Sequence, residues 1–144
     1  MRQTRLIDPA HNYTTQLQGA YVNADEALLR QALRVLVDNA RKYTPDGGNI
    51  RIAVSDGEQW VSLVVQDDGI GIPPQALPHI FDRFYRADES RARATGGNGL
   101  GLSIAKWVVD RHGGQIEVLS RQDLGTRFTI LLPRTAPPAP GDEP

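Results

Sequence analysis

The spacing of apolar residues changes from a helical to a strand-like period between residues 24 and 66. Through residues 24–44 apolar side chains recur at three- and four-residue steps, which places them on one face of a helix. They include Leu29, Leu33, Leu36 and Ala40. Asn23 or Asp25 can cap this helix, and Pro45 ends it. Because strands follow, the chain is restricted to folds that pack a helix against a sheet.

Several other segments have the composition of strands or short helices. The expected strands are residues 16–22 at an edge, 49–54, 59–66, 115–120 and 126–132, and the last two pair as a hairpin. Short helices are expected at residues 74–80 and 102–112. This order predicts an α+β fold, a two-layer α/β sandwich with helices on one face of a mixed sheet of about five strands.

The composition narrows the class of protein. The 144 residues are enough for one domain with a single core. The absence of cysteine excludes disulfides and is compatible with a reducing cytoplasm. The formal net charge of −1 gives no reason to expect nucleic acid or an anionic membrane as a partner. No apolar run approaches the ~20 residues that span a bilayer, and no signal peptide is visible.

A glycine cluster, DDGIGIP at residues 67–73, follows the apolar run 61–65. Asp67 therefore lies where a strand leaves the sheet, and its ionised carboxylate can accept a hydrogen bond from an exocyclic amine such as that of adenine. Gly69 and Gly71 have no Cβ, so we expect them to permit positive φ and to let a flat ring approach the backbone.

A second cluster, GNGLGL at residues 97–102, precedes a helical stretch. The free N–H groups of a helix start, together with glycines that let the backbone curl, form an anion site suited to phosphates. Neither cluster has the form of a P-loop or of a dinucleotide fingerprint. Either cluster alone fits a glycine-rich turn, but both in this order favour a nucleotide site.

One face of the first helix adds a third element. Val35, Asn39, Lys42 and Tyr43 follow one another at three- and four-residue steps. This face could present an amide oxygen to Mg²⁺, a cation to phosphate and an aromatic ring to a base. Taken singly, Lys42 and Tyr43 fit better as side chains that snorkel at a helix end.

The chain resembles the catalytic ATP-binding domain of bacterial sensor histidine kinases, in the GHKL superfamily that includes DNA gyrase and the MutL proteins. The resemblance extends over residues 19–133. Its motifs are similar, in order, to the asparagine box (VDNARKYTP, 37–45), the first glycine box (DDGIGIP, 67–73), the phenylalanine box (FDRFYR, 81–86), the second glycine box (GNGLGL, 97–102) and the closing glycine-threonine motif (GTRF, 125–128).

The resemblance implies roles for individual residues. Asn39 would coordinate magnesium, Lys42 would contact a phosphate and Asp67 would read the adenine amino group. Asn39, Lys42 and Arg86 form the implied catalytic set, and Arg91 or Arg93 could also neutralise the γ-phosphate. A flexible lid would cover residues 87–98. The implied ATP-binding set is Asn39, Lys42, Tyr43, Asp67, Gly69, Gly71, Ile72, Tyr85, Arg86, Gly97, Gly99, Leu100, Gly101, Leu102 and Thr126.

The resemblance also implies an activity and its partners. The domain would bind ATP with Mg²⁺ and transfer the γ-phosphoryl group to a histidine on a separate dimerisation domain, with a response regulator reached through that domain. Residues 1–15 would be the linker from the dimerisation domain, 16–134 the catalytic domain and 135–144 a disordered tail. We expect a monomeric cytoplasmic domain of an inner-membrane sensor kinase, with no nucleic acid and no direct membrane contact.

Val35 departs from the family pattern. Many members have a second asparagine at this position, and gyrase-like relatives have a glutamate that activates water. A hydrocarbon can do neither, so we expect weak intrinsic ATP hydrolysis and looser magnesium binding. Three alternatives remain open: a nucleotide-binding regulatory module without transferase activity, an anti-sigma-factor-type serine kinase, and an interaction domain whose motifs are relics.

Overall fold

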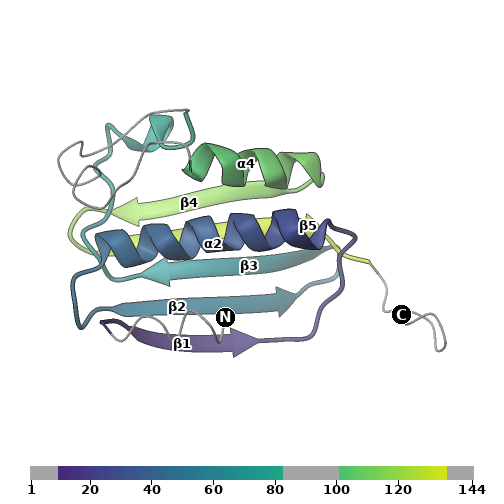
Figure 1. Cartoon of the computed structure of the whole chain (residues 1–144), viewed down its shortest axis with the longest axis horizontal. Coiled ribbons are helices and arrows are strands. Elements are labelled where there is room, and N and C mark those ends of the chain that lie inside the picture. Colours follow the sequence, from purple (N-terminus) through teal and green to yellow (C-terminus); the bar gives the residue numbers. More distant parts are fainter. Residues whose placement is uncertain (1–9, 83–100, 136–144) are drawn as a thin grey trace.

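The computed structural model describes residues 10–82 and 101–135, which form one five-stranded sheet with two α-helices on one face (Figure 1). The elements are β1 (Asn12–Leu17), α2 (Glu26–Tyr43), β2 (Asn49–Asp56), β3 (Trp60–Asp67), the 3-10 helix η1 (Leu77–His79), α4 (Gly101–Arg111), β4 (Gln115–Arg121) and β5 (Gly125–Pro133). The strand order is β1-β2-β3-β5-β4. Only the β1–β2 pair is parallel. The predicted two-layer α+β sandwich with a mixed sheet is confirmed.

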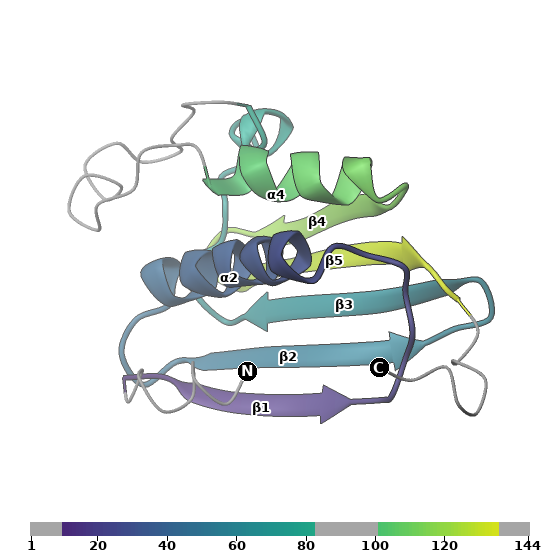
Figure 2. The ribbon, with the colours of Figure 1, turned by 45° about the vertical axis from the view of Figure 1, so that its right-hand side comes forward.

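Helix α2 begins and ends where the sequence predicts. The Asp25 carboxylate caps it by accepting the Leu28 N–H at 3.1 Å. Thr44 ends the helix with extended backbone angles, as expected of a residue before proline. The buried side chains of α2 are Ala32, Leu36, Val37 and Ala40. They pack on the sheet beside α4, and Figure 2 shows both helices in front of the same face.

The strands bury alternate residues, as a sheet covered on one face requires. The covered face of β5 carries Thr126, Phe128, Ile130 and Leu132, and that of β3 carries Val61, Leu63, Val65 and Asp67. Phe128 lies within the core, where its ring meets that of Phe81 edge to face at 6.2 Å between centroids. The alternation along β3 therefore puts a carboxylate at the last covered position of a strand that is otherwise apolar.

His112 joins the end of α4 to the start of α2. Its Nδ1–H donates to the Val108 carbonyl at 2.7 Å, and its Nε2 accepts the Asp25 backbone N–H at 2.9 Å. These two bonds require the neutral ring with the proton on Nδ1. One ring nitrogen thus donates to α4 and the other accepts from the start of α2, so the ring links the two helices.

Two expected elements differ from the structure. The edge strand is Asn12–Leu17 and not residues 16–22, so it takes up residues expected to belong to the linker. Its backbone hydrogen bonds begin at its first residue, where the Asn12 N–H donates to the Gly48 carbonyl at 2.9 Å. Val22, the last residue of the predicted strand, makes an isolated bridge to Arg134. Within residues 74–80 only Leu77–His79 is helical, as a 3-10 turn, because prolines interrupt the segment.

Among the residues described, no helix is long and apolar enough to cross a membrane.

The position of Phe128 predicts a large effect on stability. We expect Phe128→Ala to lower the free energy of unfolding by about 3–5 kcal/mol, because it opens a cavity in the core. Leu119→Ala is the matched control on the neighbouring strand, since Leu119 is 61% exposed, and it should change stability by less than about 0.5 kcal/mol. Urea denaturation of the three proteins measures this difference, and equal losses would contradict the assignment of the core.

Candidate functional site

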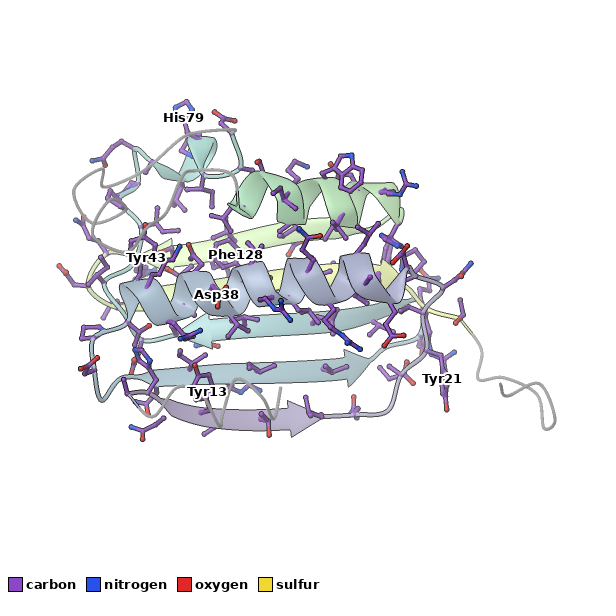
Figure 3. All side chains as sticks on the ribbon, in the orientation of Figure 1. Tyr13, Tyr21, Asp38, Tyr43, His79 and Phe128 are labelled. Atoms are coloured by element: carbon purple, nitrogen blue, oxygen red, sulfur yellow. The ribbon has the colours of Figure 1, made fainter. Side chains whose placement is uncertain are left out.

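Four parts of the fold meet at one end of the sheet. They are the C-terminal end of α2, the loop after β3, the turn between β4 and β5, and the start of α4, all on the left in Figure 1. Ile70 connects the first three: its N–H donates to the Tyr43 carbonyl at 3.0 Å, and its carbonyl accepts the Asp123 N–H at 2.7 Å. Figure 3 shows Tyr43 at this end of α2. The first glycine cluster is thus bound to helix and hairpin.

Asp67 is a buried carboxylate, 7% exposed, with backbone donors around it. Its Oδ1 accepts the Gly69 N–H at 2.9 Å, and the Thr126 backbone N–H also donates to the carboxylate. Burial raises the pKa of Asp67 above its ordinary value, and the two backbone hydrogen bonds oppose this effect in part. Asp67 is therefore a buried acceptor whose charge is only partly compensated, which is an environment typical of binding sites.

The neighbouring Asp68 has the opposite environment. It is exposed, and its carboxylate accepts the backbone N–H and the side-chain amide of Asn49, both at 2.8 Å. These hydrogen bonds lower the pKa of Asp68 below its ordinary value. Asp68 therefore holds the end of β3 to the start of β2, while Asp67 points its acceptor oxygens into the fold.

The glycines of the first cluster accommodate protein backbone. Gly71 has a φ of 73°, as expected, and a Cβ built on it would lie 2.1 Å from the Arg121 carbonyl oxygen. Gly69 does not have a positive φ, and its Cβ would lie 2.2 Å from the Tyr43 carbonyl oxygen. Across the hairpin, a Cβ on Gly125 would lie 2.1 Å from the Asp67 carbonyl oxygen. At Gly69 the missing side chain therefore leaves room for the Tyr43 carbonyl of α2, and the approach of a ligand ring to this loop stays a prediction.

The face of α2 with the predicted site residues borders the start of α4. Val35, Asn39, Lys42 and Tyr43 are all half-buried. The Val35 side chain lies 3.4 Å from the position of a Cβ on Gly101, the first described residue of α4. The two predicted apolar walls, Ile72 and Leu102, are also half-buried and pack against the core. The structure thus brings these residues to one end of the molecule.

The other predicted site residues cannot be placed. Tyr85, Arg86, Arg91, Arg93, Gly97, Gly99, Leu100 and the lid at 87–98 lie outside the described residues. Their predicted roles stay predictions.

Ser120 belongs to the site but was not among the predicted residues. Asp67, Thr126 and Ser120 lie abreast on β3, β5 and β4, each paired with the next across the sheet. The Ser120 hydroxyl accepts the Ile72 N–H at 2.8 Å. An open groove of about 320 Å³ at this end of the sheet includes all three residues in its lining, together with exposed residues of the uncovered face such as Leu119 and Arg127. The signal in the sequence was the alternation of Ile116, Val118 and Ser120, which puts a polar residue on the covered face of β4.

Comparison with known proteins gives one family. The sequence profile of the family described as histidine kinase-, DNA gyrase B-, and HSP90-like ATPase matches residues 24–136. Sensor histidine kinase YkoH of Bacillus subtilis is 46% identical over 116 residues, which are 81% of this chain and 25% of that protein. Phosphate regulon sensor protein PhoR of Pseudomonas aeruginosa is 51% identical over 126 residues, 85% of this chain and 28% of that protein. The chain thus spans about a quarter of the length of these relatives.

A solved structure agrees in fold. The mycobacterial sensor histidine kinase MprB superimposes with a TM-score of 0.80 and 32% sequence identity, covering 92% of this chain and 88% of that chain.

The two adjacent carboxylates predict opposite pH effects. Because the pKa of Asp67 is raised in the folded state, its protonated form is the stabilising one, and this contribution is lost as the pH rises through that pKa. Asp67→Asn should therefore gain stability relative to the wild type between about pH 4 and 7. Asp68→Asn should instead lose stability relative to the wild type as the pH rises towards about 4, since the pKa of Asp68 is lowered and its contribution is complete above the ordinary value. Urea denaturation from about pH 3 to 7 covers both windows, and parallel curves for the two variants over the whole range would contradict the assignment.

The close contact at Gly71 predicts an unusually large cost for a methyl group. Gly47 is the matched control, because it also has a positive φ, 86°, but has no atom within 4 Å of a built Cβ. We expect Gly47→Ala to cost about 1–2 kcal/mol through backbone strain alone. Gly71→Ala should cost more than about 3 kcal/mol, since the Arg121 backbone must move as well. Similar losses in a thermal or urea denaturation would show that the loop and the hairpin are not in tight contact.

Proposed function

The chain belongs to the family of histidine kinase-, DNA gyrase B- and HSP90-like ATPases, and we propose on this basis that it binds Mg-ATP and donates the γ-phosphoryl group to a histidine on a separate dimerisation domain. The observation that carries the proposal is Asp67, a buried carboxylate with backbone donors on the protein side. A buried acceptor with incomplete compensation favours a ligand that brings a hydrogen-bond donor.

The base would bind at the Asp67 end of the site. The adenine amino group would donate to the Asp67 carboxylate, while Ile72 and Leu102 would supply apolar contact to the ring. Both side chains are half-buried, so each has surface left for a ligand. The fixed loop supports this assignment, because a site bound to α2 and to the hairpin needs little reorganisation when the base arrives.

The phosphates would lie towards α2 and the start of α4. Asn39 fits a magnesium ligand: its side chain is half-buried and makes no hydrogen bond to any other residue in the described ranges 10–82 and 101–135. An amide oxygen is a hard donor of the kind that Mg²⁺ prefers. Magnesium would supply charge neutralisation between the phosphates. Lys42, one turn further on, and Arg86 would add positive charge, and phosphoryl transfer depends mainly on such positioning and charge stabilisation.

The acceptor histidine would come from another domain. Each of the three histidines of this chain contacts another group of this same domain. His11 contacts the Thr44 carbonyl oxygen at 2.6 Å, His79 contacts Asp82 at 3.2 Å, and His112 joins the two helices. In the transfer, the bond from the γ-phosphorus to its bridging oxygen breaks and ADP leaves. A P–N bond forms to the imidazole, and the ring proton goes to a base or to solvent.

We further propose the setting of this activity. The catalytic unit would begin with β1 at Asn12, and not at residue 16 as the sequence predicted, and would extend to residue 134. The residues before β1 would be the linker to the helical dimerisation domain, through which a response regulator receives the phosphoryl group. The parent would be a membrane sensor kinase that carries this domain on the cytoplasmic side. The isolated domain would be a monomer. The names of the relatives, a sensor histidine kinase and a sensor protein, support a sensor kinase as the parent.

Calorimetric titration of this chain with ATP and ADP, with and without magnesium, tests the site. We expect magnesium-dependent binding that Asp67→Asn weakens by roughly 10- to 100-fold, because a buried hydrogen bond to a charged group is lost. Affinity should also fall on acidification, at a higher pH than an ordinary aspartate would give, since the pKa of Asp67 is raised.

Asp68→Asn is the matched control, because the Asp68 carboxylate already accepts two hydrogen bonds from Asn49. The ATP affinity of this variant should stay within about twofold of that of the wild type. Absence of binding by the wild-type chain would leave an interaction domain as the better interpretation. With binding established, radiolabelled ATP and a histidine-bearing dimerisation domain test the transfer. Acid-labile label on that domain is expected; acid-stable label would indicate a serine kinase, and no label a regulatory module.

A further inference from the structure

Ser120 lies at the centre of a group of hydrogen bonds behind the proposed base site. It is half-buried on the covered face of β4, next to Thr126 on β5, which is itself next to Asp67 on β3. Its Oγ lies 2.8 Å from the Ile72 nitrogen, 3.0 Å from the Gly125 carbonyl oxygen and 2.9 Å from the Thr126 Oγ1. One hydroxyl thus touches both the glycine loop and the hairpin.

The number of protons fixes the direction of these bonds. A serine hydroxyl has one proton to donate and two lone pairs to accept with. The Ile72 N–H can only donate and the Gly125 carbonyl can only accept, so Ser120 accepts from the first and donates to the second. The remaining lone pair of Ser120 then accepts the proton of Thr126. As a result, the Thr126 hydroxyl has only lone pairs left for other partners.

The side chains of Asp67 on β3 and Thr126 on β5 therefore offer a ligand hydrogen-bond acceptors and no donor. Asp67 presents carboxylate oxygens, two of whose bonds come from backbone N–H groups, and Thr126 presents hydroxyl lone pairs beside them. Adenine carries an amino group at the position where guanine carries a carbonyl oxygen. A carbonyl facing this row would meet acceptors without a donor, which is the costly arrangement for a buried polar group.

We propose that Ser120 is a positioning residue that fixes the Thr126 hydroxyl as an acceptor and so makes the base site selective for an amino-bearing purine over a carbonyl-bearing one. This inference rests on the proposed function, because it deepens the nucleotide site. Without Ser120, the Thr126 hydroxyl is free to rotate and donate to the guanine carbonyl, and Ile72 loses the bond that holds its backbone.

The test compares Mg-ATP and Mg-GTP binding by calorimetry for the whole chain and for Ser120→Ala. We expect the ratio of the two affinities to fall by about three- to tenfold in the variant, which is the effect of one redirected hydrogen bond. A merely structural loss would weaken both nucleotides equally, since they share the ribose and phosphates, and would leave the ratio unchanged. An unchanged ratio would overturn the proposal.

A double-mutant cycle with Thr126→Val isolates the route. Valine has no hydroxyl to orient, so adding Ser120→Ala to Thr126→Val should leave the ATP to GTP ratio unchanged. A further fall in the double variant would show that Ser120 acts by another path and would contradict the proposal. Ser62→Ala, on the opposite face of β3, is the matched control and should leave both affinities as in the wild type.

Two further measurements cover the case in which Ser120→Ala fails to fold. Ser120→Thr keeps the hydroxyl and should retain the wild-type ratio, whereas a loss of selectivity with intact folding would count against the proposal. In the wild type, the Ile72 amide should be protected from hydrogen exchange, and rapid exchange would show that the bond to Ser120 does not persist. If the wild-type chain binds ATP and GTP equally, the selectivity proposal fails while the nucleotide site stands; if it binds neither, the proposed function fails as well.

Discussion

Direct backbone packing between the loop 67–72 and the β4–β5 turn is the constraint on which the site depends. Gly71 and Gly125 allow this packing because neither has a Cβ. The space that a Cβ would fill is taken by a carbonyl oxygen of the other segment, that of Arg121 at Gly71 and that of Asp67 at Gly125. The contact brings the N–H groups of the loop and of β5 to the Asp67 carboxylate. Without them, a charge in this position would be buried with little compensation, which costs several kcal/mol. The glycines therefore help to stabilise the buried Asp67 carboxylate, whether or not a ligand is bound.

Much of this arrangement could be predicted from local sequence. The boundaries of α2 follow from a cap at Asp25 and a proline at position 45, both of which act within a few residues. The alternation along β3 and β5 predicts which side chains are covered, and it is this alternation that turns Asp67 inward. The motifs predicted the family, which the sequence profile bears out.

What could not be predicted depends on contacts between distant segments. Local composition predicted the first strand at residues 16–22, whereas the strand lies at Asn12–Leu17, where Asn12 can bond the turn after α2. The role of His112 as a link between the helices depends on the backbone N–H of Asp25 at the start of α2, which lies 87 positions away in the sequence. The neighbour that excludes a side chain at Gly69 is the Tyr43 carbonyl at the end of α2, which the local sequence does not indicate. Each of these partners lies far away in the sequence, so a pattern read from neighbouring residues cannot predict it.

The bond between Ile72 and Ser120 spans 48 positions of the chain and has a consequence for folding. A contact of this kind, like the pairing of β3 with β5, forms late, because closing a long loop costs entropy before any contact repays it. The β2–β3 hairpin and α2 can assemble early from nearby residues, but the base end cannot. It should be the last part to appear on refolding and the first to be lost on partial unfolding. Nucleotide binding would then report complete folding, and a nascent chain would stay inactive until β5 had joined the sheet.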